Sequence, residues 1–131
     1  MRAWIAAIAT VLVFSLAAGA TASAAVFRGS ASDDPKMAVK LTLSAGAVTF
    51  EYSDVLTGCS DGSQVRQGGA VHETVLNELG KFKDTLAKDG VTSTVRGKLG
   101  GARATGVVHF EFAYDGGECN SEKVEWKARR K

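Results

Sequence analysis

The chain has 131 residues, of which 45% are hydrophobic, and it carries 16 lysines and arginines against 14 acidic residues. This length is enough for one domain with a small core and leaves little material for a second. A formal net charge of +2 gives no strong excess of either sign. The charge balance therefore argues against a nucleic-acid partner held by general electrostatic attraction, which needs a basic excess on one face.

Residues 1–24 have the organisation of a secretory signal peptide, which we expect to be helical. One positive charge, Arg2, precedes an apolar run from Ala3 to Gly19, and small residues follow with an A-x-A cleavage pattern at Ala22–Ala24. We expect cleavage after Ala24, which leaves one domain of residues 25–131 in a secreted, extracellular protein without a membrane segment. An uncleaved anchor is the alternative, but the apolar run is short against the roughly 20 residues that span a bilayer.

The dominant pattern after the signal is the alternation of apolar and polar side chains. Val39–Leu43 and Val48–Tyr52 alternate with a period of two, and the tight-turn candidate Ser44–Ala47 joins them into a hairpin. Three later runs alternate in the same way, at Val91–Leu99, Ala104–Tyr114 and Val124–Arg129. Turns separate them at Asp89–Gly90, Gly100–Gly101 and Asp115–Gly117. The pattern predicts an antiparallel sheet with one buried face.

The segment Glu73–Lys88 is ambiguous between a helix and a strand. Val75, Leu79, Phe82 and Leu86 recur at helical spacing among good helix formers, and this periodicity slightly favours a helix. Gly80 interrupts the middle of the segment, so a short strand from Lys81 remains the alternative.

Two cysteines, Cys59 and Cys119, are the only ones in the chain. In an exported protein such a pair predicts a disulfide, which would stabilise the fold by about 4 kcal/mol in the chain-entropy account. A catalytic thiol is the alternative, but it needs a basic partner that lowers its pKa. The two histidines, His72 and His109, lie in no sequence context typical of a cysteine protease.

The last residues form the one dense charge cluster, Lys127, Arg129, Arg130 and Lys131. We interpret this cluster as a solvated tail rather than as a patch that binds polyanions.

Several short motifs resemble an uncharacterised family of small exported all-β proteins of actinobacteria. The motifs are Phe27-Arg28-Gly29, Cys59-Ser60-Asp61-Gly62, Gly80-Lys81-Phe82, Val95-Arg96-Gly97, Gly101–Val107 and Cys119–Ala128. The resemblance implies a disulfide-linked all-β domain in which Leu79–Leu86 is a strand opposite Val91–Leu99. It brings no activity with it.

Catalytic and metal motifs do not stand out. The histidines lack zinc-ligand spacing, the carboxylates form no convincing acid–base pair, and no serine or glycine-rich motif indicates a hydrolase or a phosphate loop. A disulfide would bring two polar loops together, and the candidate binding cluster is then Asp61, Asp115, Glu118 and Asn120. Calcium is one ligand that such oxygen atoms can hold, but turn-forming residues explain the cluster equally well. We expect no catalytic residue, no bound metal and no cofactor.

The expected fold is a single antiparallel meander of about eight strands, forming a small β-sandwich or a flattened β-barrel with one disulfide. The expected function is that of a monomeric, non-enzymatic binding or structural module that engages a protein or glycan at the cell exterior. The alternative is a small barrel that carries a lipophilic ligand. The two differ in whether Phe110, Phe112 and Trp126 line an enclosed cavity or fill a packed core.

Overall fold

The computed structural model describes residues 24–131, which form eight β-strands in a meander. The strands are β1 (Ala25–Ala31), β2 (Ala38–Ser44), β3 (Ala47–Cys59), β4 (Gln64–Val75), β5 (Lys81–Lys88), β6 (Val91–Gly100), β7 (Arg103–Tyr114) and β8 (Gly117–Arg130). The predicted all-β class is confirmed. The predicted signal peptide lies outside the described residues except for Ala24, and β1 begins at the next residue. No helix in the described part of the chain is long and apolar enough to cross a membrane.

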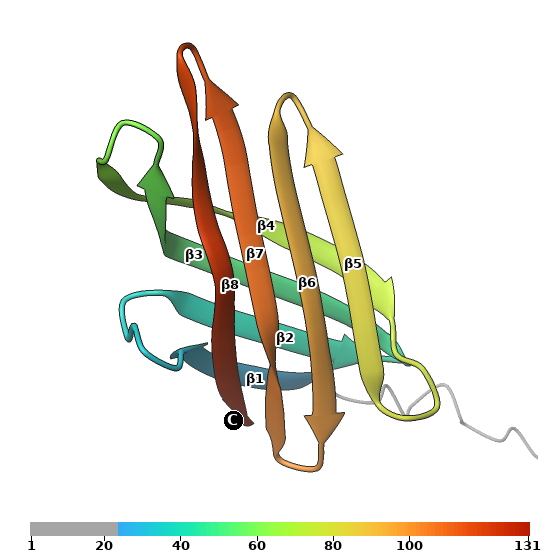
Figure 1. The fold of residues 1–131 in the computed structure, drawn as a ribbon. Coiled ribbons are helices and arrows are strands. Elements are labelled where there is room, and N and C mark those ends of the chain that lie inside the picture. The colour runs from blue at the N-terminus through green and yellow to red at the C-terminus, as the bar shows by residue number, and fades with distance from the viewer. Residues whose placement is uncertain (1–23) are drawn as a thin grey trace, which may run out of the picture.

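The strands form one sheet that is folded into two facing layers. All ladders are antiparallel, and the strand order is β4-β3-β2-β1-β8-β7-β6-β5. Strands β1–β4 make one layer and β5–β8 the other, and the two layers cross (Figure 1). Because β1 pairs with both β2 and β8, the first and last strands join the two layers at the centre of the sheet.

Two irregularities bend the long strands. Asp54 and Gly68 adopt positive φ angles of 61° and 69° where the β3–β4 ladder skips one residue of each strand. A second register shift, between His109 and Glu111, accompanies a φ of 57° at Glu122. Bulges increase the local twist and bend of a strand. Beyond these points the end of β3 pairs with the start of β8, through Gly58–Asn120 and Cys59–Cys119.

The predicted disulfide is present at this junction. Cys59 and Cys119 are direct cross-strand partners and are bonded to each other. The turn after Cys59 docks on β8 as well, because the Ser60 N–H donates to the Glu118 carbonyl and the Glu118 N–H donates to Ser60 Oγ. The disulfide therefore joins the two layers at one end of the sandwich.

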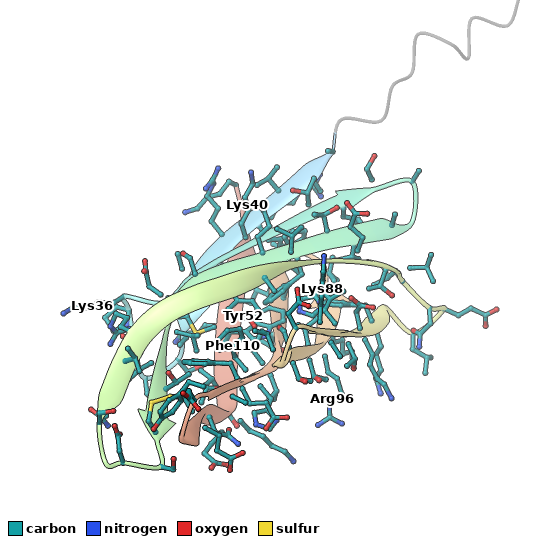
Figure 2. All side chains as sticks on the ribbon, turned by 90° about the horizontal axis from the view of Figure 1, so that it is seen from above. Lys36, Lys40, Tyr52, Lys88, Arg96 and Phe110 are labelled. Atoms are coloured by element: carbon teal, nitrogen blue, oxygen red, sulfur yellow. A yellow bond between two sulfur atoms is a disulfide. The ribbon has the colours of Figure 1, made fainter. Side chains whose placement is uncertain are left out.

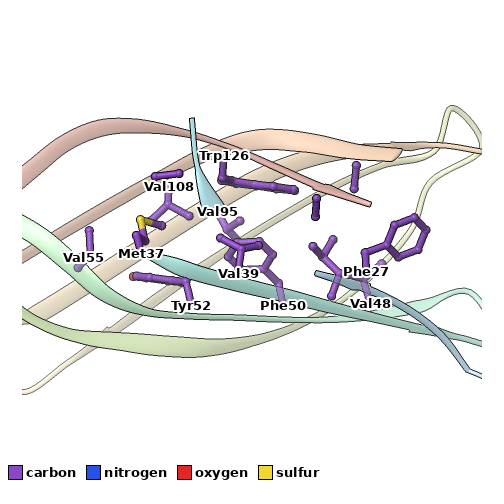
Figure 3. Close-up of a cluster of buried hydrophobic side chains, with 14 of the residues drawn as sticks. Phe27, Met37, Val39, Val48, Phe50, Tyr52, Val55, Val95, Val108 and Trp126 are labelled. Atoms are coloured by element: carbon purple, nitrogen blue, oxygen red, sulfur yellow. The ribbon is translucent and has the colours of Figure 1, made fainter. Parts of the chain in front are cut away.

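The core lies between the layers and follows the strand alternation that the sequence shows (Figure 3). Phe50 packs on Trp126 with 4.8 Å between ring centroids, and Tyr52 meets Phe110 edge-on. Gly97 and Gly106 are cross-strand partners beneath the indole. A Cβ atom at Gly97 would lie 2.8 Å from Trp126, and one at Gly106 only 2.5 Å from it. The small residues therefore leave room for the large ring, which is the dense interdigitation typical of a filled core.

The helix that periodicity favours within Glu73–Lys88 is wrong. Strand β4 continues to Val75, a loop follows, and β5 begins at Lys81, in agreement with the strand that the family resemblance implies. Val75 and Leu79 are 74% and 70% exposed, so the helically spaced residues do not form a buried face. Gly80 turns the chain with a φ of 76°. The strand period instead directs Phe82 into the core.

Candidate functional site

The four residues of the predicted polar cluster have different surroundings: Asp61 and Asn120 use their side chains in hydrogen bonds, Glu118 bonds Ser60 through its backbone, and Asp115 lies in the turn between β7 and β8. Asp61 Oδ1 accepts from the N–H and hydroxyl of Ser63, which hold the pKa of Asp61 below its usual range. Asn120 Oδ1 lies 2.7 Å from His109 Nε2 and accepts from the Glu122 N–H. No hydrogen bond in the described residues links two members of the cluster.

Metal binding at this end of the sheet has no support in the geometry. Within residues 24–131, no group of three or more histidine, cysteine, aspartate or glutamate side chains is placed to hold a metal ion. The disulfide does bring the two loops together, as the sequence predicts. The Asp61 carboxylate bonds Ser63 within its own turn.

A buried chain of polar groups that the sequence does not reveal crosses the molecule between the layers. His72 on β4 lies with Nδ1 2.8 Å from Asp84 Oδ2 on β5 and with Nε2 2.7 Å from Ser93 Oγ on β6. Ser93 Oγ also shares a hydrogen bond with the Tyr52 hydroxyl on β3. A neutral imidazole protonated on Nδ1 satisfies the whole chain: Tyr52 donates to Ser93, Ser93 to His72, and His72 to Asp84.

The order Asp84–His72–Ser93 is that of a hydrolase triad, in which a histidine activates a serine. A nucleophile must meet its substrate, however, and here His72 is 0% and Ser93 1% exposed. None of the three lines any of the surface depressions described below. We therefore interpret the group of Tyr52, His72, Asp84 and Ser93 as a structural clasp.

Burial of the Tyr52 hydroxyl raises the pKa of Tyr52 to about 12. The hydrogen bond with Ser93 has a smaller effect in the opposite direction.

The clasp spans the open seam of the sheet. Strands β4 and β5 are the two ends of the strand order and share no backbone ladder. They are joined by the His72–Asp84 contact and by Thr74 Oγ1, which donates to the Lys83 carbonyl at 3.2 Å. The flattened sandwich is therefore closed at this seam by side chains.

The most distinctive surface feature is a path of three neighbouring depressions on the outer side of β5–β8 and β1. Their volumes are about 370, 320 and 290 Å³. The first and second share Thr105, and the second and third share Arg96 and Val107. Ten basic residues and no carboxylate line them, and we call these ten the basic track: Arg28, Lys81, Lys83, Arg96, Lys98, Arg103, Lys123, Lys127, Arg129 and Lys131.

Strand register gathers these residues. Lys81 pairs with Lys98, and Lys98 pairs with Thr105, which pairs with Lys127. Directly paired residues of neighbouring strands project to the same face of a sheet. The apolar partners of each strand face the core, so the basic side chains lie outside. Figure 2 shows Arg96 on the side of the molecule opposite Lys40, with Tyr52 and Phe110 between the layers.

Within the described residues, no lysine or arginine of the basic track forms an ion pair. In residues 24–131 the ion pairs formed by lysine or arginine are Lys40–Glu51 at 3.9 Å and Arg66–Asp34 at 2.6 Å, and neither involves the track. The Arg66 hydrogen bond holds the pKa of Asp34 below its usual range. Three carboxylates, Glu111, Glu118 and Glu125, share the outer face of β5–β8 without lining the three depressions. Glu125 lies between Lys123 and Lys127 of the track along β8 and is the direct partner of Val107.

The other two depressions have mixed charge. The one of about 460 Å³ over β1–β4 includes Glu51 beside Lys40, and the one of about 610 Å³ near the β1–β2 loop includes Asp33, Asp34 and Glu125. None of the five depressions is lined by Phe110, Phe112 or Trp126. Phe110 and Trp126 are instead buried members of the core between the layers.

Two expectations about charge need correction. The C-terminal basic cluster is exposed to solvent as expected, but it is not a tail, because β8 runs to Arg130 and places Lys127 and Arg129 within the sheet. Net charge also concealed the asymmetry of the surface. Residues 24–131 hold 15 bases and 14 acids, yet ten of the bases line one path of depressions. The sequence does indicate which residues of each strand point outward. Which of these residues lie side by side on neighbouring strands depends on the strand register.

No protein-family model matches the chain, and comparisons with curated proteins and with solved structures find no similar protein. The resemblance to an actinobacterial family therefore stays an expectation, and function has to be argued from the surface itself.

Proposed function

We propose that the protein is exported and acts outside the cell as a non-enzymatic binding module for a linear anionic carbohydrate polymer, held along the basic track. Export rests on the signal-peptide pattern of residues 1–24 and agrees with the disulfide, because disulfides persist in oxidising compartments. The observation that carries the ligand class is the path of three depressions lined by ten basic residues, none of which forms an ion pair within the described part of the chain.

The shape of the track favours a polymer over a small ligand. The depressions are shallow and connected end to end across several strands, so that a chain with regularly spaced negative charges can occupy all of them at once. Small-molecule sites are more often concave, largely apolar pockets that enclose their ligand. A polymer also gains from several weak contacts made together.

The lining chemistry favours a carbohydrate over a nucleic acid. No phenylalanine, tyrosine or tryptophan lines the three depressions; His109 is the one ring beside the basic residues and threonines. Proteins that hold single-stranded nucleic acids combine positive grooves with aromatic side chains on which bases stack. Lysines, arginines and threonine hydroxyls instead suit a polymer of acidic sugars or sugar esters.

The test is retention on immobilised dextran sulfate, with neutral dextran as the matched ligand control. The decisive variant is Lys81→Gln/Lys98→Gln/Lys127→Gln, which removes one cross-strand row of the track. Its control is Lys36→Gln/Lys88→Gln/Arg130→Gln, which removes the same charge at residues that line none of the three depressions; Figure 2 labels Lys36 and Lys88. We expect retention of the natural protein to fall as salt rises. The track variant should elute at clearly lower salt, and the control variant at nearly the natural value.

Failure of the natural protein to bind at low salt would overturn the proposal, as would equal losses in the two triple variants. An oligonucleotide of matched charge serves as competitor. If it displaces the protein more effectively than soluble dextran sulfate of similar length, the assignment to a carbohydrate polymer is wrong.

A further inference from the structure

We propose that the depression at the β1–β8–β7 end of the basic track is a discrete pocket for a phosphate group of the bound polymer, an inference that rests on the proposed function. This depression, of about 370 Å³, is lined by five basic residues, more than either of the other two. They are Arg28, Arg103, Lys127, Arg129 and Lys131.

Three arginines of this pocket stand in one cross-strand row. Arg129 on β8 is the direct partner of Arg28 on β1 and of Arg103 on β7. Neighbouring strands are about 4.8 Å apart, so about 10 Å separates the outer two backbones. All three side chains are exposed and project to the same face.

This arrangement is unfavourable without a ligand. Like charges directly opposite each other on a sheet destabilise it, and no carboxylate in the described residues forms an ion pair with any of the three. The next residue in the row, Lys40, already has Glu51 beside it at 3.9 Å. A row of three uncompensated guanidinium groups is explained if an anion neutralises it when the pocket is filled.

The geometry of the donors points to phosphate rather than to carboxylate. Guanidinium groups bind phosphate and carboxylate in a two-pronged manner. A carboxylate has two oxygens and is saturated by one or two such forks. The tetrahedral phosphate group distributes its negative charge over more oxygens, so three arginines from adjacent strands can share it, and Lys127 and Lys131 add charge from the rim. The rest of the track, which is rich in lysine, supplies less directional attraction.

The pocket and the track can be tested separately with two double variants of equal charge. Arg28→Gln/Arg129→Gln breaks the arginine row, whereas Lys81→Gln/Lys98→Gln removes two charges from the adjoining depression. The probes are inorganic phosphate, acetate at equal ionic strength, and dextran sulfate. Binding of the small anions is followed by amide chemical shifts around the pocket, and thermal unfolding is measured with and without phosphate.

We expect phosphate, but not acetate, to shift the amides around Arg28, Arg103 and Arg129. The arginine variant should bind phosphate at least tenfold more weakly, while the lysine variant binds it normally and loses affinity mainly for dextran sulfate. At low salt without phosphate, the arginine variant should melt at a higher temperature than the natural protein, because repulsion has been removed. A merely structural role for the arginines predicts the opposite shift.

The outcomes distinguish this inference from the proposed function. If dextran sulfate binds but phosphate shifts the amides no more than acetate does, the proposal of a phosphate pocket is wrong and the polymer site stands. The same conclusion follows if the two double variants lose equal affinity for phosphate. If the natural protein binds neither dextran sulfate nor phosphate, both proposals fail.

Discussion

Tyr52 shows how one buried hydroxyl depends on the groups around it. It stacks near His72 with 6.3 Å between ring centroids, meets Phe110 edge-on, and shares a hydrogen bond with Ser93. The hydroxyl is therefore satisfied only while the clasp is intact, and its ionised form would be a charge in an apolar interior. Burial penalises that charge, which is why the pKa of Tyr52 rises to about 12.

This shift predicts a loss of stability in alkaline solution. Because the pKa of Tyr52 in the folded state is higher than the ordinary tyrosine value of 10.0, the contribution is complete below pH 10 and disappears as pH rises from 10 to about 12. Its size is about 2 to 3 kcal/mol. Urea unfolding at pH 9, 11 and 12 should show a steeper decline for the natural protein than for Tyr52→Phe.

The variant provides the comparison because it lacks the titrating group while keeping the ring. At pH 9 it should be less stable by about 1 kcal/mol, the typical value of one hydrogen bond. The chain has no free cysteine in its described part, so alkaline thiol exchange does not complicate the measurement. Parallel declines of the two proteins would contradict the assignment.

At the scale of elements, the seam between β4 and β5 is where the sheet lacks backbone pairing. The strands on either side of it are edges, and unpaired edges tend to open or to pair with other chains. His72 reaches across the seam to Asp84 and inward to Ser93, so a single side chain connects three strands. We infer that the clasp keeps β5 in place.

Replacement of this side chain should loosen the seam. His72→Ala removes a fully buried ring and leaves Ser93 without its acceptor, so we expect the free energy of unfolding to fall by about 3 kcal/mol. Amide hydrogen exchange should speed up first in β5. His109→Ala is the matched control, because His109 is half-buried and its contacts, with Asn120 at 2.7 Å and Glu111 at 4.0 Å, lie away from the seam; its cost should stay below about 1 kcal/mol. Equal costs for the two histidines would refute the clasp.

At the scale of the whole molecule, the disulfide and the charge distribution are the organising features. The disulfide closes a loop of 60 residues and ties the layers together at one end, while the basic track covers the outer side of β5–β8. Most carboxylates lie elsewhere, in turns and on the other strands. A molecule with nearly balanced charge thus presents one strongly positive surface.

Removing the disulfide should affect stability much more than ligand binding. The variant Cys59→Ala/Cys119→Ala should lose about 4 kcal/mol of unfolding free energy, because the unfolded chain regains the entropy of a loop of this length. Under conditions where the variant is folded, we expect its retention on dextran sulfate to match that of the natural protein. Selective loss of retention in a folded variant would show that the track depends on the disulfide junction.

Most of the strands follow from local pattern. The hairpin of β2 and β3, the three turns with adjacent glycines and the buried positions Ala104, Val108 and Phe110 of β7 are confirmed, because alternation and turn chemistry act over a few residues. The alternation fails at the end of β7, where Tyr114 is exposed. For the segment from Val75 to Leu86, periodicity favours a helix because its apolar residues also fit helical spacing, whereas the structure has a loop and a strand there. Tertiary pairing with β6 overrides a modest helical propensity.

The candidate site, like the fold, follows only in part from local sequence. Composition and local pattern alone determine an all-β domain with a cysteine pair, and they predict export. They do not reveal the clasp, since Tyr52, His72, Asp84 and Ser93 come from four strands and meet only when the layers face each other. Nor do they reveal the basic track. The alternation of side chains predicts that a charged residue points outward. Which residue lies beside it on the next strand depends on strand order and register, and these arise from long-range packing between segments up to a hundred residues apart.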